Sequence, residues 1–203
     1  ESAKLASARH PQTNGICERS PAPVYQLHIE LRYTDPVIWR RLLVPGSAKL
    51  SKLHAILQLA MGWEGGHLHE FVIGETRYGE SDPDFPSDLP VEDEKKITLA
   101  KALGARETFT YLYDYGDDWQ HRVKVEKALL PDLDLPYPIC LDGGNACPLE
   151  DVGGVPGYYE FLEAINDPTY EAHQAMLEWC GGSFDPAAFG LNEVNQRLSE
   201  VKL

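Results

Sequence analysis

The sequence predicts an α+β fold: a single domain with an antiparallel-rich mixed sheet, one packed helix and a C-terminal helical group. Residues 25–33 alternate apolar and polar side chains, which is typical of a strand with one buried face. Residues 51–61 space their apolar side chains at three and four positions, as an amphipathic helix does. Helical spacing returns over residues 158–201. One sheet, one helix against it and a later group of helices are therefore expected.

Length and composition suit one globular domain. The chain has 203 residues, of which 43% are hydrophobic and 25% are charged. Residues 1–23 contain few large apolar side chains and end in Ser-Pro-Ala-Pro, so a flexible tail is expected there and a folded domain over residues 24–203. The net charge of −14 disfavours non-specific binding of nucleic acid, which requires a surplus of lysine and arginine.

Cysteine content and hydropathy indicate the compartment. Four cysteines in a chain of this length are too few for a disulfide-built scaffold. No apolar run approaches the ~18 residues of a membrane span. The first residues also lack the basic and then apolar pattern of a signal peptide. We therefore expect a cytoplasmic protein with no membrane partner.

The next elements follow from breaks in the pattern. Asp35-Pro36 ends the first strand, and residues 37–44 resume an extended pattern. Ser51 is expected to cap the helix and Gly62 to end it. His54 and Gln58 lie one turn apart beside its apolar stripe, and we interpret them as a helix-surface pair.

The spacing of polar and apolar residues after the helix predicts the next segments, residues 67–103. If a strand begins at His67, then His67 and His69 point to the same face, an arrangement that metal sites use. Residues 80–94 hold seven acids, three prolines and no lysine or arginine before Lys95, so a solvated loop is expected. Residues 97–103 suggest a short helix closed by Gly104.

The stretch from Tyr111 to Val125 concentrates the polar chemistry. Two apolar-alternating runs meet at Gly-Asp-Asp, residues 116–118, and predict a β-hairpin with polar side chains near its turn. Residues 131–157 are rich in proline and glycine and predict a long loop, which in a compact domain is commonly functional. A helix over 158–165, a second starting at Asp167-Pro168 and a final one after Asp185-Pro186 complete the chain.

The residues expected around this hairpin indicate two kinds of site. The first is a polar binding pocket for a protein or small-molecule partner, lined by Trp63, Asp114, Asp117, Trp119, His121, Glu150 and Asp151. The second is a metal site, with zinc as the candidate ion and with His67, His69, His121, Cys140 and Cys147 as candidate ligands. The two cysteines are separated by more than the two to four residues usual in structural zinc sites. The alternative is that the aspartates bind turn amides and the cysteines pack as small apolar groups.

Other chemistries find weaker support. A cysteine with His121 would make a nucleophile and base only if the fold brings the two together. No Walker-type loop, no Gly-x-Gly-x-x-Gly turn and no Gly-x-Ser-x-Gly elbow is present. Direct binding of DNA would have to use a local basic face formed by Arg32, Arg40, Arg41, Lys49 and Lys52.

Ordered short motifs run through most of the chain. They are Pro36-x-Ile38-Trp39-Arg40-Arg41, Gly62-Trp63-x-x-x-His67-Leu68-His69, Tyr113-Asp114-x-Gly116-Asp117-x-Trp119-x-His121, and Ala146-Cys147-Pro148-x-Glu150-Asp151-x-Gly153-Gly154. Together they resemble the plasmid pRiA4b ORF-3-like family, whose members occur on plasmids and within transposable elements. Leu149 departs from the family pattern, in which a second proline is usual.

The resemblance implies an α+β fold and no established biochemical activity. Some family members carry a resolvase label, but this sequence shows neither the nucleophilic serine among arginines nor the basic helix of a serine recombinase. We therefore expect a cytoplasmic accessory or binding protein of mobile genetic elements. The alternatives are a zinc-type metal-dependent enzyme and a DNA-binding accessory to recombination.

Overall fold

The computed structural model describes residues 22–80 and 90–203, which form one eight-stranded sheet with five helices. The strands are β1 (Val24–Leu31), β2 (Ile38–Pro45), β3 (His69–Ile73), β4 (Thr76–Gly79), β5 (Val91–Asp93), β6 (Thr108–Tyr113), β7 (Trp119–Leu129) and β8 (Ile139–Gly144). The helices are α1 (Leu50–Met61), α2 (Leu99–Leu103), α3 (Gly154–Asn166), α4 (His173–Trp179) and α5 (Leu191–Leu198).

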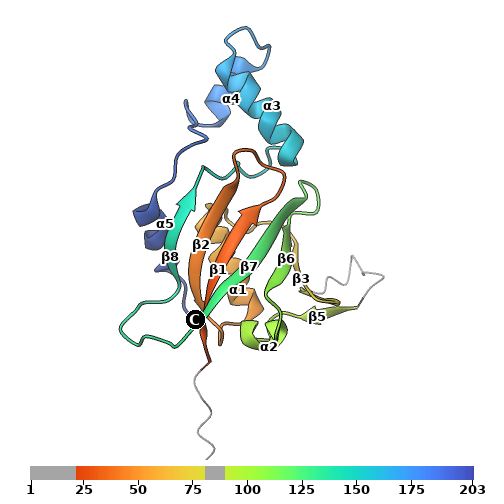
Figure 1. The fold of residues 1–203 in the computed structure, drawn as a ribbon. Coiled ribbons are helices and arrows are strands. Elements are labelled where there is room, and N and C mark those ends of the chain that lie inside the picture. The colour runs from red at the N-terminus through yellow and green to blue at the C-terminus, as the bar shows by residue number, and fades with distance from the viewer. Residues whose placement is uncertain (1–21, 81–89) are drawn as a thin grey trace, which may run out of the picture.

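The sheet runs in the order β5-β4-β3-β6-β7-β1-β2-β8 (Figure 1). All neighbouring strands are antiparallel except β4 and β5, which are parallel. The predicted antiparallel-rich mixed sheet is therefore confirmed. The longest strand, β7, pairs with both β6 and β1 and places the predicted hairpin at the centre of the sheet.

Helix α1 covers one face of the sheet and forms the core with it. Alternation in β1 buries Leu27 and Ile29 completely, and α1 buries Leu53 and Ile56 opposite them. Each such side chain contributes about 1.5–3 kcal/mol relative to leaving it in water. The helix ends as predicted at Gly62, whose φ of 97° is a left-handed conformation that suits glycine. In Figure 1 α1 lies behind the sheet.

The remaining helices lie around the edges of the sheet. Helix α5 contacts α1 and β8 beside one edge, whereas α2 lies at the end of the sheet where the chain enters it (Figure 1). Helices α3 and α4 pack on each other at the opposite end, beyond the turn between β1 and β2 (Figure 1). None of the helices within 22–80 and 90–203 is long and apolar enough to span a bilayer.

Several boundaries differ from the sequence-based predictions. The third strand begins at His69, so His67 belongs to the preceding loop. The expected loop over 131–157 contains β8, and the expected acidic loop ends in the short strand β5; residues 81–89 of that loop lie outside the described residues, as do 1–21 of the predicted tail. Asp167 does not start a helix. It ends α3 and accepts hydrogen bonds from Thr169 in a turn, and α4 begins later.

Candidate metal centre

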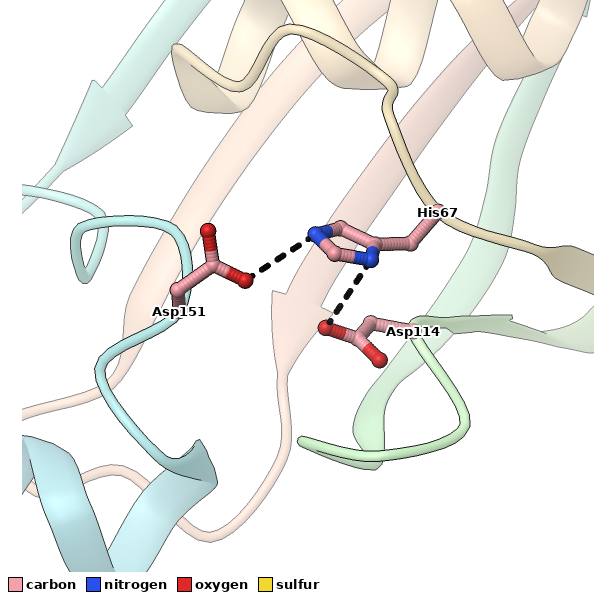
Figure 2. A group of neighbouring side chains, drawn as sticks. All are labelled: His67, Asp114 and Asp151. Atoms are coloured by element: carbon pink, nitrogen blue, oxygen red, sulfur yellow. Dashed lines mark ion pairs between the residues drawn. The ribbon is translucent and has the colours of Figure 1, made fainter.

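Three segments that are distant in sequence meet at one end of the sheet. They are the loop between α1 and β3, the turn between β6 and β7, and residues 145–153 between β8 and α3. Each brings one side chain to a common point: His67, Asp114 and Asp151 (Figure 2).

The β6–β7 turn positions Asp114 through its own backbone. Asp114 and Asp118 have φ angles of 57° and 55°, a left-handed conformation that aspartate tolerates better than most residues. The Oδ1 atom of Asp114 accepts hydrogen bonds from the backbone N–H groups of Gly116, at 2.8 Å, and Asp117, at 3.4 Å. This turn fixes the carboxylate and directs its second oxygen toward His67.

Hydrogen bonds donated to Glu150 and Pro148 fasten the 145–153 loop. The Tyr113 hydroxyl donates to one carboxylate oxygen of Glu150, and the backbone N–H of Glu64 donates to the other at 2.9 Å. The Trp63 Nε1–H donates to the carbonyl of Pro148 at 2.9 Å. Burial first, and then the Glu150 carboxylate, raise the pKa of Tyr113, so its proton stays in this bond.

A glycine allows the loop to approach the turn. The Gly153 N–H donates to the Asp117 carboxylate at 3.1 Å, and the next residue, Gly154, has a φ of 67°. A Cβ atom on Gly154 would lie 2.4 Å from the carbonyl oxygen of Asp117, closer than atoms can pack. Only glycine therefore permits the contact that places Asp151 beside His67.

His67 lies between the two aspartates (Figure 2). Its Nε2 atom is 3.1 Å from Oδ1 of Asp151, and its Nδ1 atom is 3.7 Å from Oδ2 of Asp114. One nitrogen and one oxygen from each aspartate all lie within 4.8 Å of one another. Within 22–80 and 90–203 no other set of three histidine, cysteine or acidic residues meets this criterion.

The surroundings of His67 are strongly acidic. Asp117 and Glu150, whose carboxylates accept hydrogen bonds from the backbone N–H groups of Gly153 and Glu64, add to the negative charge of the two aspartates. Among the described residues, the ion pairs of Asp114 and Asp151 are made with His67, and no lysine or arginine joins them. The cluster thus has a local excess of negative charge that favours a cation.

The aromatic residues of the predicted pocket lie beneath this cluster, within the core. Trp63, Trp119 and His121 are buried, with 3%, 1% and 0% of their surfaces exposed. The Trp63 ring stacks on Tyr113 and meets the edge of His121. Burial lowers the pKa of His121 to about 4, and its Nε2 atom has no partner among the described residues. These residues support the site from below and do not line an opening.

His69 joins a neighbouring network that the sequence patterns did not reveal. Its Nε2 atom lies 2.8 Å from the buried carboxylate of Glu94, and its ring stacks face to face on His54 with centroids 3.5 Å apart. His54 Nδ1 and Gln58 both bind the Tyr111 hydroxyl at 2.8 Å, so the expected helix-surface pair is wrong. Burial, and secondarily His69, lower the pKa of His54 to about 3. A cavity of about 320 Å³ lies between this network and His67.

The two cysteines lie apart from the histidines and flank Arg40. Cys140 is buried in β8, and its backbone N–H donates to Asn195 at 2.8 Å. Burial raises the pKa of the Cys140 and Cys147 thiols despite the nearby guanidinium. The structure therefore brings His67 of the five predicted metal ligands to the cluster and leaves His69, His121, Cys140 and Cys147 in other surroundings.

The basic residues proposed for DNA binding are mostly engaged within the protein. Arg40 is 3% exposed and donates to the carbonyls of Trp39, Ala60, Gly144 and Asn145. Arg41 forms a bidentate pair with Glu126, and Lys49 donates to the carbonyl of Lys95. Arg40 is thus buried away from any phosphate, whereas Arg32, Lys49 and Lys52 are exposed.

The family model for plasmid pRiA4b ORF-3-like proteins matches residues 23–193. The chain belongs to this family. The family match confirms the resemblance drawn from the ordered motifs, all of which lie inside the matched range. It assigns no activity, so the function has to be argued from the site.

Two relatives extend over nearly the whole chain. Uncharacterized protein y4hQ of Sinorhizobium fredii is 40% identical over 184 residues, which is 89% of this chain and 93% of that protein. The crystal structure of protein of unknown function MM3350 from Methanosarcina mazei has a TM-score of 0.78 and 34% identity, and the match covers 86% of this chain and 97% of that one. The α+β fold of this chain is therefore shared with MM3350.

Proposed function

We propose that this protein binds a divalent metal ion of zinc type through His67, Asp114 and Asp151. The observation that supports this proposal is the convergence of one imidazole nitrogen and two carboxylate oxygens within 4.8 Å from three separate segments. Imidazole and carboxylate are both ordinary zinc ligands. Each nitrogen of the imidazole, which is 36% exposed, faces a different aspartate, so metal binding requires the ring to rotate until one nitrogen faces an ion held by both carboxylates.

The charge of the cluster supports a metal rather than a purely structural role. A carboxylate group that stabilises a fold usually faces a lysine, an arginine or a set of backbone donors. Asp114 fits this description through Oδ1, which accepts the turn N–H groups, but Oδ2 of Asp114 and Oδ1 of Asp151 face the imidazole, and the described residues supply no arginine or lysine to pair with them. A divalent ion would supply the missing positive charge.

Three protein ligands leave at least one position open for water or another ligand. Open positions distinguish catalytic and exchangeable zinc sites from closed structural ones. A metal-dependent enzyme is therefore the second candidate, and the observation that favours it is the cavity lined by His67, one of the three proposed ligands. Hydrolysis of p-nitrophenyl acetate and p-nitrophenyl phosphate by the zinc-loaded protein, lost in His67→Gln, would support this candidate.

Calorimetric titration with ZnCl₂ after treatment with EDTA tests metal binding. We expect one ion per chain, and His67→Gln should weaken binding by more than about 100-fold, beyond the loss caused by removing an outer-shell partner. Asp114→Asn tests the carboxylate without disturbing the turn, since asparagine also accepts turn N–H bonds and tolerates a left-handed backbone. Affinity should also fall in acid, because protons compete for the imidazole.

His28→Gln is the matched control. His28 also faces two carboxylates, Glu30 and Glu126, but it lies on the open face of the sheet, where Arg41 binds one of them. This variant should bind zinc as the unaltered protein does. Equal affinity in His67→Gln and the unaltered protein, with both folded by circular dichroism, would refute the proposed site.

The proposal includes an accessory role in the cytoplasm for plasmids or transposable elements. The family's name refers to a plasmid, and the three described cysteines are free, which suits a reducing compartment. Replacing the gene on its replicon by the His67→Gln form tests this role. The change should alter replicon maintenance as a deletion does, and unchanged maintenance in the deletion would refute it.

A further inference from the structure

The negative charge of the chain is concentrated in one segment. Between Lys127 and Arg197 the sequence has twelve acidic residues and neither a lysine nor an arginine, whereas the remainder of the chain is nearly balanced. Helices α3 and α4 and their connection lie in the middle of this segment. They carry Glu160, Glu163, Asp167, Glu171 and Glu178.

An apolar groove lies between α3 and α4. Phe161 and Ala164 form its floor and are 2% and 1% exposed, while Met176 and Trp179 form its wall. The Trp179 ring packs edge-on against Phe161, with centroids 5.6 Å apart, yet 48% of Trp179 is exposed. A half-exposed tryptophan beside a methionine is typical of a surface that accepts a partner.

The described part of the chain leaves this groove open. Helix α4 buries none of its residues, and His173 holds it to α3 through a 2.8 Å contact with the carbonyl of Ala164. The pair extends beyond the end of the sheet (Figure 1). A helical pair in this position is accessible to another molecule without any movement of the sheet.

Volume and charge specify the occupant. The groove holds about 270 Å³, below the ~300–1,000 Å³ of ordinary small-molecule pockets and enough for one large apolar side chain. Glu160 and Asp151 line its rim, and Tyr170 donates to Glu160 at 3.0 Å, which fixes that carboxylate. A ligand entering here meets an apolar floor and an anionic rim.

From these observations we propose that the α3–α4 groove binds a lysine- or arginine-rich segment of a partner protein, which inserts one large apolar side chain against Phe161 and Trp179. The basic residues of that segment face the carboxylates on α3 and α4. A second copy of this chain fits poorly, because its most exposed leucines, Leu130 and Leu133, lie beside Asp132 and Asp134. This proposal does not depend on metal binding.

Fluorescence anisotropy with labelled synthetic peptides tests the proposal. The probe is an 18-residue amphipathic peptide of lysine and leucine, and two controls replace all lysines by glutamate or all leucines by serine. We expect only the lysine–leucine peptide to bind, with affinity falling as salt rises because the rim charges are exposed. Met176→Gln and Glu160→Gln should each weaken binding about five- to tenfold.

The variants and their control separate the outcomes. Asp134→Asn removes an exposed acid from the same base-free segment, in the loop between β7 and β8 and outside the groove lining, and should leave binding unchanged. Equal binding of the lysine–serine peptide, or equal affinity in Met176→Gln and the unaltered protein, would refute the groove and indicate diffuse charge attraction. Self-association in analytical ultracentrifugation that Met176→Gln abolishes would assign the groove to a second copy and overturn the proposal.

Discussion

Two histidines of this protein face carboxylate pairs with nearly the same spacing. His28 in β1 lies 3.1 Å from Glu30 and 3.8 Å from Glu126, and His67 lies 3.1 Å from Asp151 and 3.7 Å from Asp114. The first group lies on neighbouring strands of one sheet. The second combines two loops with the end of a hairpin.

The groups differ in what neutralises the carboxylates. At His28, the Arg41 guanidinium donates two hydrogen bonds to Glu126, at 2.7 and 3.0 Å, and Gln26 donates a third at 2.6 Å. Arg41 above all lowers the pKa of Glu126 to about 2. At His67 the described chain provides no equivalent of Arg41. Similar histidine geometry therefore gives a self-neutralised surface cluster in one place and a candidate cation site in the other.

Gly154→Ala should break the His67 group and leave the His28 group intact. The new methyl group would collide with the carbonyl of Asp117 and strain a left-handed backbone, so we expect the free energy of unfolding to fall by about 3 kcal/mol. Gly181→Ala is the control, because Gly181 also has a positive φ of 79° but has no atom within 4 Å of a new Cβ. It should cost only about 1 kcal/mol. Equal losses in urea unfolding would contradict the close contact of loop and turn.

Arg41→Met should unbalance the His28 group. The change removes the guanidinium, which binds Glu126 and also lies over the Trp39 ring, so we expect a loss of about 1–2 kcal/mol, within the range for hydrogen bonds to charged groups at a partly exposed site. The pKa of Glu126, followed by ¹³C NMR, should return toward 4.5. Arg32→Met, which removes a guanidinium bound only to Gln120 and Tyr33 among the described residues, should change neither quantity.

The smallest effect is expected in the pH dependence of the free energy of unfolding. The pKa of folded Glu126 lies below its ordinary value of 4.5, so its stabilising effect is complete above pH 4.5 and is lost as the pH falls toward 2. Partial exposure reduces the expected effect to about 1 kcal/mol. It is measured as the difference in unfolding free energy between the unaltered protein and Glu126→Gln. The pKa values of half-buried His54 and buried His121 are lowered, so each contributes stability that is lost from pH 6.5 downward. This loss is the same in both proteins and cancels in the difference. A difference that does not change with pH would contradict the Arg41–Glu126 interaction.

Much of the fold follows from the sequence because local periodicity determines it. Alternation over residues 25–33 and 109–125 identified the central strands, and Gly62 marked the end of α1. Strand β8 was missed because Gly143 and Gly144 look like a loop. In the structure they let the Phe189 and Trp39 side chains lie against the strand, since a Cβ atom at either glycine would come within 2.6 Å of one of these rings. That requirement is tertiary and leaves no periodic signal.

The site was only partly predictable for a similar reason. Asp114 and Asp151 were among the candidate pocket residues and His67 among the candidate metal ligands, but the sequence could not show that these three meet. His67 and His69 looked paired by their spacing of two, yet the strand begins at His69 and separates them. The partner of His69, Glu94, lies in a run of acids that pattern alone assigns to solvent, whereas it is 2% exposed. In both cases, the surroundings of the histidine depend on contacts with residues that are distant in the sequence.

Arg40 and Gly154 together affect how a metal ion would exchange at the candidate metal centre. The guanidinium of Arg40 donates hydrogen bonds to the carbonyls of Gly144 and Asn145 at one end of the loop. At the other end, Gly154 packs closely against the backbone of Asp117. Residues 146–153 are therefore held at both ends, and Asp151, whose side chain is 72% exposed, lies between these ends. Within the loop, Trp63, Tyr113 and Glu64 also hold Pro148 and Glu150, so the part that remains free to move is the exposed Asp151 side chain. A metal ion would then enter and leave as the Asp151 carboxylate moves, while His67 and Asp114 stay in position.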